Sequence, residues 1–148
     1  MKGGGWWFIL LFMVDYDNND AFAPARRRMI EYDLVGRGIK DAAVLGAMGS
    51  VRREEFVPVK YQGQAYADNP LPIGTGQTIS QPYIVGLMTE GLEPVAGDRV
   101  LEIGTGCGYQ TAVLARIVDR VYSIERFNEL SEAAQRNLEK VGVGNVEF

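Results

Sequence analysis

A glycine-rich loop, Gly104-Thr105-Gly106-Cys107-Gly108, carries the strongest chemical signal in the sequence. It directly follows a predicted strand and opens a predicted helix. Glycine lets the main chain turn through conformations that a β-carbon obstructs, and it lets a ligand approach the backbone closely. The first N–H groups of the following helix have no partner inside that helix and can bind a polar ligand. The segment therefore predicts a cofactor-binding loop.

The spacing of the glycines distinguishes between classes of cofactor. Dinucleotide-binding loops follow G-x-G-x-x-G, which would require glycine at Tyr109, whereas the third glycine here is Gly108. No Gly-Lys-Ser/Thr follows, which excludes a P-loop. A G-x-G-x-G loop with Glu102 two residues before it favours S-adenosylmethionine. A dinucleotide-dependent oxidoreductase remains a distant alternative.

Two acidic residues stand at the ends of predicted strands. Glu125 lies roughly 20 residues after the first glycine, where a carboxylate accepts both hydrogen bonds of a ribose diol in nucleoside-binding α/β domains. Its alternative role is an ion pair with Arg126 or a solvated strand end. Glu102 is expected to orient the loop or the ammonium group of the methionine part, and its alternative is bonding to nearby backbone.

The missing residue types narrow the chemistry further. The 148 residues include no histidine, so Ser-His and Cys-His nucleophilic catalysis are excluded. The single cysteine, Cys107, cannot form an internal disulfide, and nothing near it has metal-ligand spacing. We expect no metal site. Any reaction must therefore proceed without imidazole.

An α/β pattern surrounds these residues. Apolar spacing predicts a helix over 24–35 that stops at Gly36, and a second over 42–48 that Asp41 caps. An irregular segment over 56–76 precedes a third helix that begins at Pro82 and runs to about Glu90. The remaining expected elements are strand 99–103, helix 109–118, strand 120–124, helix 128–141 with Asn128 as its cap and Gly142 as its stop, and a strand from 145 to 148. This order is the first half of a doubly wound sheet.

Charge and the N-terminus limit the partners. The formal net charge of −4 offers no overall positive field, so nucleic acid is not an expected partner, and Arg26, Arg27 and Arg28 are interpreted as a solvated face. Residues 1–23 are expected to be a leader or disordered segment, and their apolar run is too short to span a bilayer. We expect a cytoplasmic monomer; export remains the alternative if residues 1–23 act as a signal peptide.

The segment Leu71–Tyr83, read LPIGTGQTISQPY, resembles the motif that precedes the glycine loop in protein-L-isoaspartate O-methyltransferases, especially the bacterial ones. Together with 53–58 and 101–110, the resemblance covers residues 25–148. It implies methyl transfer from S-adenosylmethionine to the carboxylate of L-isoaspartyl or D-aspartyl residues in damaged proteins. The implied fold is the first half of a class I, Rossmann-like methyltransferase domain with an N-terminal helical segment.

The resemblance also implies roles for individual residues. Ser80 matches the active-site serine, and Thr78 and Ile79 flank it beside substrate and cofactor. The expected cofactor-binding residues are Gln77, Glu102, Gly104, Gly106, Gly108, Tyr109, Gln110, Glu125 and Arg126. A serine hydroxyl can donate a hydrogen bond to a carboxylate and aim it, without acting as a nucleophile. Ser80 can also be a plain cap of the helix that begins at Pro82.

Family members continue beyond this point with further strands, and the ligand crevice of a doubly wound sheet lies beside its fourth strand. We therefore expect a truncated product or fragment with weak or no activity. Two other functions stay open. One is a class I methyltransferase with a different substrate, and the other is a non-catalytic module that uses the loop to bind a partner.

Overall fold

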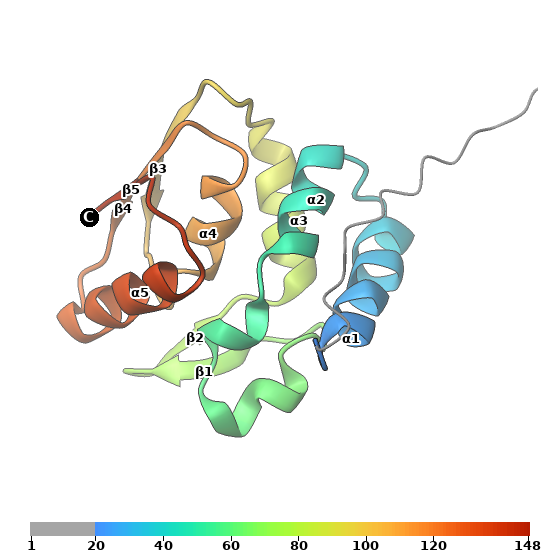
Figure 1. The fold of residues 1–148 in the computed structure, drawn as a ribbon, viewed down its shortest axis with the longest axis horizontal. Helices are drawn as coiled ribbons and strands as arrows, with labels where there is room; N and C mark the ends of the chain where they lie inside the picture. The colour runs from blue at the N-terminus through green and yellow to red at the C-terminus, as the bar shows by residue number, and fades with distance from the viewer. Residues whose placement is uncertain (1–19) are drawn as a thin grey trace, which may run out of the picture.

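The computed structural model describes residues 20–148, so positions 1–19 of the expected leader lie outside the described residues. Figure 1 shows an N-terminal helical part, with α1 and α2, beside a small α/β unit, with α3 between them. The helices are α1 (Ala23–Arg28), α2 (Ala42–Ser50), α3 (Pro82–Leu92), α4 (Tyr109–Ala115) and α5 (Asn128–Lys140), and the strands are β1 (Leu71–Gly74), β2 (Gln77–Ile79), β3 (Arg99–Ile103), β4 (Arg120–Ile124) and β5 (Val146–Glu147).

The first helical segment continues further than expected. After α1 the chain passes through a π-helical stretch, Met29–Leu34, and a 3₁₀ turn, Val35–Arg37. It ends at Gly38, whose φ of 100° stops the helix, and not at Gly36. In α2 the expected cap is confirmed, because Asp41 Oδ1 accepts a hydrogen bond from Val44 N at 2.9 Å.

The segment predicted to be irregular over 56–76 contains regular structure. Short 3₁₀ helices span Arg53–Phe56 and Val59–Gln64, and β1 and β2 form an antiparallel hairpin. The hairpin turn has positive φ at Gly74 and Gly76, which glycine adopts without strain, and also at Thr75, where the φ of 49° is strained for a β-branched residue. The prediction missed β1 and β2 because neither strand has an alternating pattern long enough to signal a sheet.

The α/β unit follows the expected order. The strands β3, β4 and β5 are parallel, in the order β3-β4-β5. The predicted bounds of β3 and β4 are confirmed, while α4 ends at Ala115, three residues before its expected end. Asn128 is not the cap of α5, since Phe127 holds that position and makes no side-chain cap. Gly142, with φ 69°, follows the end of α5 as expected.

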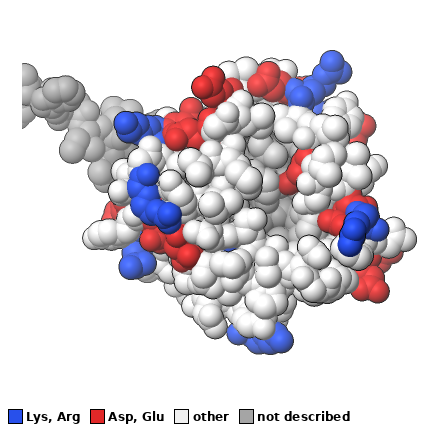
Figure 2. Space-filling model, turned by 180° about the vertical axis from the view of Figure 1, so that it is seen from behind, with Lys and Arg blue, Asp and Glu red and all other residues white. Residues whose placement is uncertain are grey.

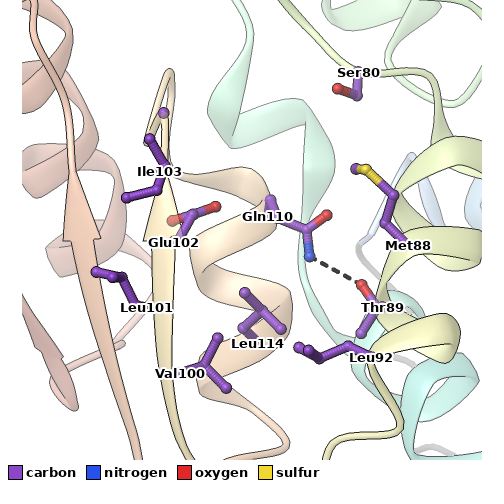
Figure 3. Close-up of a pocket in the computed structure, with 11 residues that line it drawn as sticks. Ser80, Met88, Thr89, Leu92, Val100, Leu101, Glu102, Ile103, Gln110 and Leu114 are labelled. Atoms are coloured by element: carbon purple, nitrogen blue, oxygen red, sulfur yellow. Dashed lines mark hydrogen bonds between the residues drawn. The ribbon is translucent and has the colours of Figure 1, made fainter.

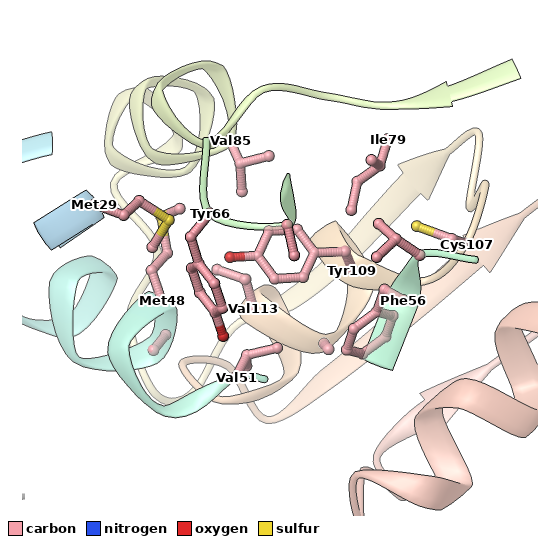
Figure 4. Close-up of a cluster of buried hydrophobic side chains, with 14 of the residues drawn as sticks. Met29, Met48, Val51, Phe56, Tyr66, Ile79, Val85, Cys107, Tyr109 and Val113 are labelled. Atoms are coloured by element: carbon pink, nitrogen blue, oxygen red, sulfur yellow. The ribbon is translucent and has the colours of Figure 1, made fainter. Parts of the chain in front are cut away.

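One continuous core joins the two parts of the molecule. It runs from Met29 and Met48 in the helical part through Tyr66 to Tyr109 and Val113 in α4, as Figure 4 shows. Because the N-terminal helices and the α/β unit bury side chains in the same core, the helices are an integral part of the fold that carries the glycine loop.

The predicted solvated face is correct for Arg27 and Arg28, which are exposed, and wrong for Arg26. Arg26 is buried, and it donates hydrogen bonds from Nε to Tyr66 Oη at 2.8 Å and from a terminal nitrogen to Asp20 at 2.9 Å. Glu54, also buried, lies 3.4 Å from the same guanidinium. Tyr66 and Glu54 lie 40 and 28 residues away in sequence, which is why the local charge pattern suggested a solvated face.

On the rear face, side chains of both charge signs alternate around the rim, and mostly uncharged atoms surround a central hollow (Figure 2). Among residues 20–148, no helix is long and apolar enough to cross a membrane.

Candidate active site

The glycine loop joins the carboxyl end of β3 to the start of α4. Gly104, Gly106 and Gly108 all have positive φ, at 94°, 58° and 88°. The amides of Gly104 and Thr105 both donate to Ile124 O, at 2.7 and 3.3 Å, so the loop is fixed to the end of β4. The carboxyl edge of a parallel sheet is where α/β proteins bind ligands, and the loop lies on that edge.

Three hollows open around this loop. One of about 390 Å³ lies between β3 and α3 and is lined by Ser80, Glu102, Gly104 and Gln110, among others (Figure 3). The second, of about 350 Å³, is bordered by Gln77, Thr78, Gly104, Gly106, Glu125, Arg126 and Phe127. The third, of about 70 Å³, brings Thr78, Ile79 and Ser80 against Gly104, Gly106, Tyr109 and Gln110. The structure therefore brings together every site residue expected from the sequence except Gly108.

Two hydroxyl groups hold the carboxylate of Glu102 in place. Thr111 Oγ1 and Ser123 Oγ donate to its Oε2 at 2.5 and 2.6 Å. Its Oε1 is buried and has no hydrogen-bond partner among the described residues. Burial raises the pKa of Glu102 above its ordinary value, although the two hydroxyl donors act in the opposite direction. The expected alternative, bonding to nearby backbone, is not what the structure shows.

Gln110 presents a second unpartnered oxygen. Its Nε2 donates to Thr89 Oγ1 at 2.9 Å, and its Oε1 is buried without a partner among the described residues. Figure 3 shows Glu102 and Gln110 reaching into the space between β3 and α3. Buried polar atoms are normally hydrogen-bonded, so two such oxygens facing one hollow indicate a site for a donor group from a ligand.

Glu125 lies at the end of β4 and folds back over the loop. Its Oε2 accepts from Gly106 N at 2.9 Å and its Oε1 from Phe127 N at 3.0 Å. Partial burial would raise the pKa of Glu125, but backbone donors from Gly106, Phe127 and Arg126 outweigh it and hold the pKa below the ordinary value. Each oxygen keeps acceptor capacity for one more donor, which suits a vicinal diol. No ion pair joins this carboxylate to Arg126 in the described part of the chain.

Two of the expected cofactor-binding residues, Gly108 and Tyr109, pack inside the protein. A β-carbon at Gly108 would lie 3.3 Å from Ala134 Cβ in α5, so glycine is needed there for helix packing as well as for its backbone angle. The Tyr109 side chain is only 1% exposed and packs edge-on against Phe56, with ring centroids 5.6 Å apart. Any contact of Tyr109 with a cofactor must therefore involve mainly its backbone.

Ser80 lies exposed at the junction of β2 and α3. It does not cap α3, because Gln81 holds the N-cap position and makes no side-chain cap. The cap comes from outside the helix: Asp68 Oδ1 accepts from Tyr83 N at 2.9 Å, and Asp68 Oδ2 from Gln81 Nε2 at 3.2 Å. Ser80 O accepts a hydrogen bond from Arg53 at 2.8 Å. The serine hydroxyl is thus available to a ligand.

Sequence reasoning missed several residues that build the site. Thr111 and Ser123 orient Glu102, Thr89 holds Gln110, and Phe127 borders the Glu125 hollow. Phe127 could have been found, since it follows Glu125 in the same loop after a strand. The hydroxyl residues carry no sequence signal, because their roles depend on which strand and helix faces meet. No group of three or more potential metal-ligating side chains occurs within residues 20–148.

Similarity to known proteins extends over most of the chain. The family model described as protein-L-isoaspartate(D-aspartate) O-methyltransferase matches residues 25–148. The chain is 58% identical over 119 residues to a protein-L-isoaspartate O-methyltransferase of Methylorubrum populi, covering 80% of this chain and 56% of the relative. It is 57% identical over 122 residues to the enzyme of that name from Methanoregula boonei, covering 82% of this chain and 56% of the relative.

Solved structures agree with the sequence comparison. One protein-L-isoaspartate O-methyltransferase superposes with a TM-score of 0.72 at 34% identity, covering 83% of this chain and 41% of its own. A protein from Plasmodium falciparum, described as a putative enzyme of the same kind in complex with S-adenosyl-L-homocysteine, superposes with a TM-score of 0.70 at 25% identity, covering 82% and 61%. The chain spans about half the length of the curated relatives it matches. It belongs to the protein-L-isoaspartate(D-aspartate) O-methyltransferase family.

Proposed function

We propose that this chain carries the cofactor loop and the active-site serine of an S-adenosylmethionine-dependent carboxyl O-methyltransferase that acts on L-isoaspartyl and D-aspartyl residues of damaged proteins. The observation that supports this most is the smallest hollow, where Ser80 and the glycine loop face the same space of about 70 Å³. A methyl acceptor held by the serine and a donor held by the loop would meet there. Family membership supports S-adenosylmethionine as the donor and an isoaspartyl carboxylate as the acceptor.

The residues present fit the proposed cofactor. Glu102 Oε1 and Gln110 Oε1 are buried acceptors without partners, and an ammonium group is a donor that satisfies such atoms. Glu125 keeps acceptor capacity for ribose hydroxyls on the other side of the loop. Gly104 leaves open space where a β-carbon would stand. When bound, S-adenosylmethionine would supply a sulfonium methyl group that is already activated.

The chain's own contribution is alignment. An ionised carboxylate is already nucleophilic, so no general base is needed and the absence of histidine is no obstacle. The Ser80 hydroxyl donates a hydrogen bond to one carboxylate oxygen and leaves the other oxygen facing the loop. Holding two reactants in line removes much of the entropic cost of their meeting. Ile79, 4% exposed, is the apolar side chain beside Ser80 that keeps water from that side of the hollow.

Methyl transfer to a matched pair of peptides tests the proposal. One peptide contains L-isoaspartate and its twin contains L-aspartate at the same position. At the weak rate expected of this chain, we expect labelled methyl from S-adenosylmethionine to enter the first peptide only, and Ser80→Ala to reduce the rate about tenfold or more through the lost hydrogen bond. Ser131→Ala, on α5 and away from the three hollows, is the control and should keep the wild-type rate.

Three outcomes would count against the proposal. Equal methylation of both peptides would point to a different methyltransferase substrate. Cofactor binding by calorimetry without any turnover would favour a non-catalytic module, and absence of both would refute the site in this chain. The cytoplasmic location and the monomeric state expected from the sequence remain predictions, which cell fractionation and sedimentation test.

A further inference from the structure

Arg53 is the largest fully buried side chain of the described residues, with 0% exposure. Its guanidinium holds two main-chain carbonyl groups from different segments. Nε donates to Ala65 O at 2.6 Å, and a terminal nitrogen donates to Ser80 O at 2.8 Å. The guanidinium carbon lies 4.7 Å from the centre of the Tyr109 ring, so the group also stacks against the first residue of α4.

This buried cation has no carboxylate within 4 Å among residues 20–148. Arg26, buried to a similar degree, is neutralised by Asp20 and Glu54. Burial lowers the pKa of Arg53, which reflects the cost of removing its charge from water. A buried cation without an ionic partner is costly, so its two carbonyl contacts and its ring contact must offset that cost. One of those contacts, at Ser80 O, is with the segment that carries the serine hydroxyl.

The Ser80 segment depends on such distant contacts. The start of α3 has no side-chain cap of its own, and β2 pairs only through three residues of a short hairpin. Arg53 donates a hydrogen bond to Ser80 O, and Asp68 accepts one from Tyr83 N. These two contacts span 27 and 15 residues of sequence.

We propose that Arg53 is a positioning residue for Ser80: by fixing the Ser80 carbonyl, it fixes the backbone from which the serine hydroxyl projects toward the smallest hollow. This inference rests on the proposed function of Ser80. The planar fork of arginine reaches two carbonyls at once, which the single ammonium of lysine cannot reproduce. Arg53→Lys therefore keeps the charge but releases one carbonyl.

A double-mutant cycle distinguishes positioning from general stabilisation. Arg53→Lys alone should lower kcat about tenfold to a hundredfold, with KM for S-adenosylmethionine unchanged within about twofold. In the Ser80→Ala background the same change should cost less than about threefold, because the group that Arg53 positions is already gone. Arg52→Lys is the control: Arg52 is exposed and paired with Glu54 and Glu55, and its variant should behave as wild type.

Hydrogen exchange supplies a readout that needs no turnover, so it separates this inference from the proposed function. In Arg53→Lys, the amides of residues 77–81 and of Tyr83 should exchange at least about tenfold faster, while those of α5 stay unchanged. Arg53→Gln repeats the measurement with a neutral donor in case the lysine variant fails to fold. Unchanged exchange at 77–83, equal loss of protection in α5, or kinetic effects that multiply in the double variant would each overturn the proposal.

Discussion

Replacing Gly108 by alanine tests why the third glycine of the loop is needed. Its φ of 88° is a conformation that costs an L-residue roughly 1–2 kcal/mol. The new β-carbon would also lie 3.3 Å from Ala134 Cβ and 3.4 Å from Leu138 Cγ, inside the packed face of α5. Overpacking a core typically costs roughly 1–3 kcal/mol, so the two contributions together predict a loss of about 2–5 kcal/mol of unfolding free energy.

Gly142→Ala is a matched control for the backbone contribution. Gly142 has φ 69°, but nothing lies within 4 Å of a β-carbon built there, so its variant should lose only the roughly 1–2 kcal/mol of backbone strain. Urea denaturation followed by circular dichroism measures both variants against wild type. If the Gly108→Ala variant is no less stable than the Gly142→Ala variant, the packing argument is refuted. The third glycine would then be needed only for cofactor binding.

Other substitutions probe the remaining supports of the site. Glu125→Gln should weaken binding of S-adenosyl-L-homocysteine in calorimetry by about tenfold. Because its folded pKa is lowered, the Glu125 carboxylate stabilises the fold above its unfolded pKa, so the stability gap to the variant should close as pH falls through the folded value. Asp68→Ala removes the distant cap of α3 and should cost about 1 kcal/mol in urea denaturation. Arg26→Met should cost roughly 3–5 kcal/mol by leaving buried Glu54 with Arg52 as its remaining cationic partner, and wild-type stability would contradict the buried network.

The elements that sequence predicted well are those whose signals are local. Apolar runs predict β3 and β4, and the glycine spacing predicts the loop between β3 and α4. Each of these signals lies within ten residues of sequence. Their parallel pairing then places Glu102 and Glu125 at one edge of the sheet, which is why both carboxylates could be assigned before the structure. The spacing of the glycines also separated the cofactor classes without any tertiary information.

The features that sequence missed depend on partners far along the chain. Nothing near Arg26 predicts that Tyr66, 40 residues on, accepts its hydrogen bond. The sequence offered Ser80, its neighbour in sequence, as an alternative cap of α3, but Asp68 supplies the cap across the hairpin. The substrate side of the site, around Ser80, is therefore less predictable than the cofactor side, around the glycine loop. Long-range contacts hold the substrate side in place.

The two carboxylates at the sheet edge should respond to pH at different points. The pKa of Glu102 is raised by burial, so the folded protein binds its proton more tightly than the unfolded chain does, and stability falls as pH rises through this range. An ammonium ligand requires the ionised form, so affinity for S-adenosyl-L-homocysteine should fall as pH drops through that raised pKa, before Glu125 takes up a proton.

Methylthioadenosine, which lacks the ammonium and carboxylate groups, separates the two carboxylates. Its affinity should stay constant where that of S-adenosyl-L-homocysteine declines, and Glu102→Gln should abolish the difference between the two pH profiles. The unpartnered Oε1 requires this result, because only a ligand with a donor at that position uses the charge of Glu102. Parallel pH profiles for the two ligands in the wild-type chain would show that the ammonium group binds elsewhere.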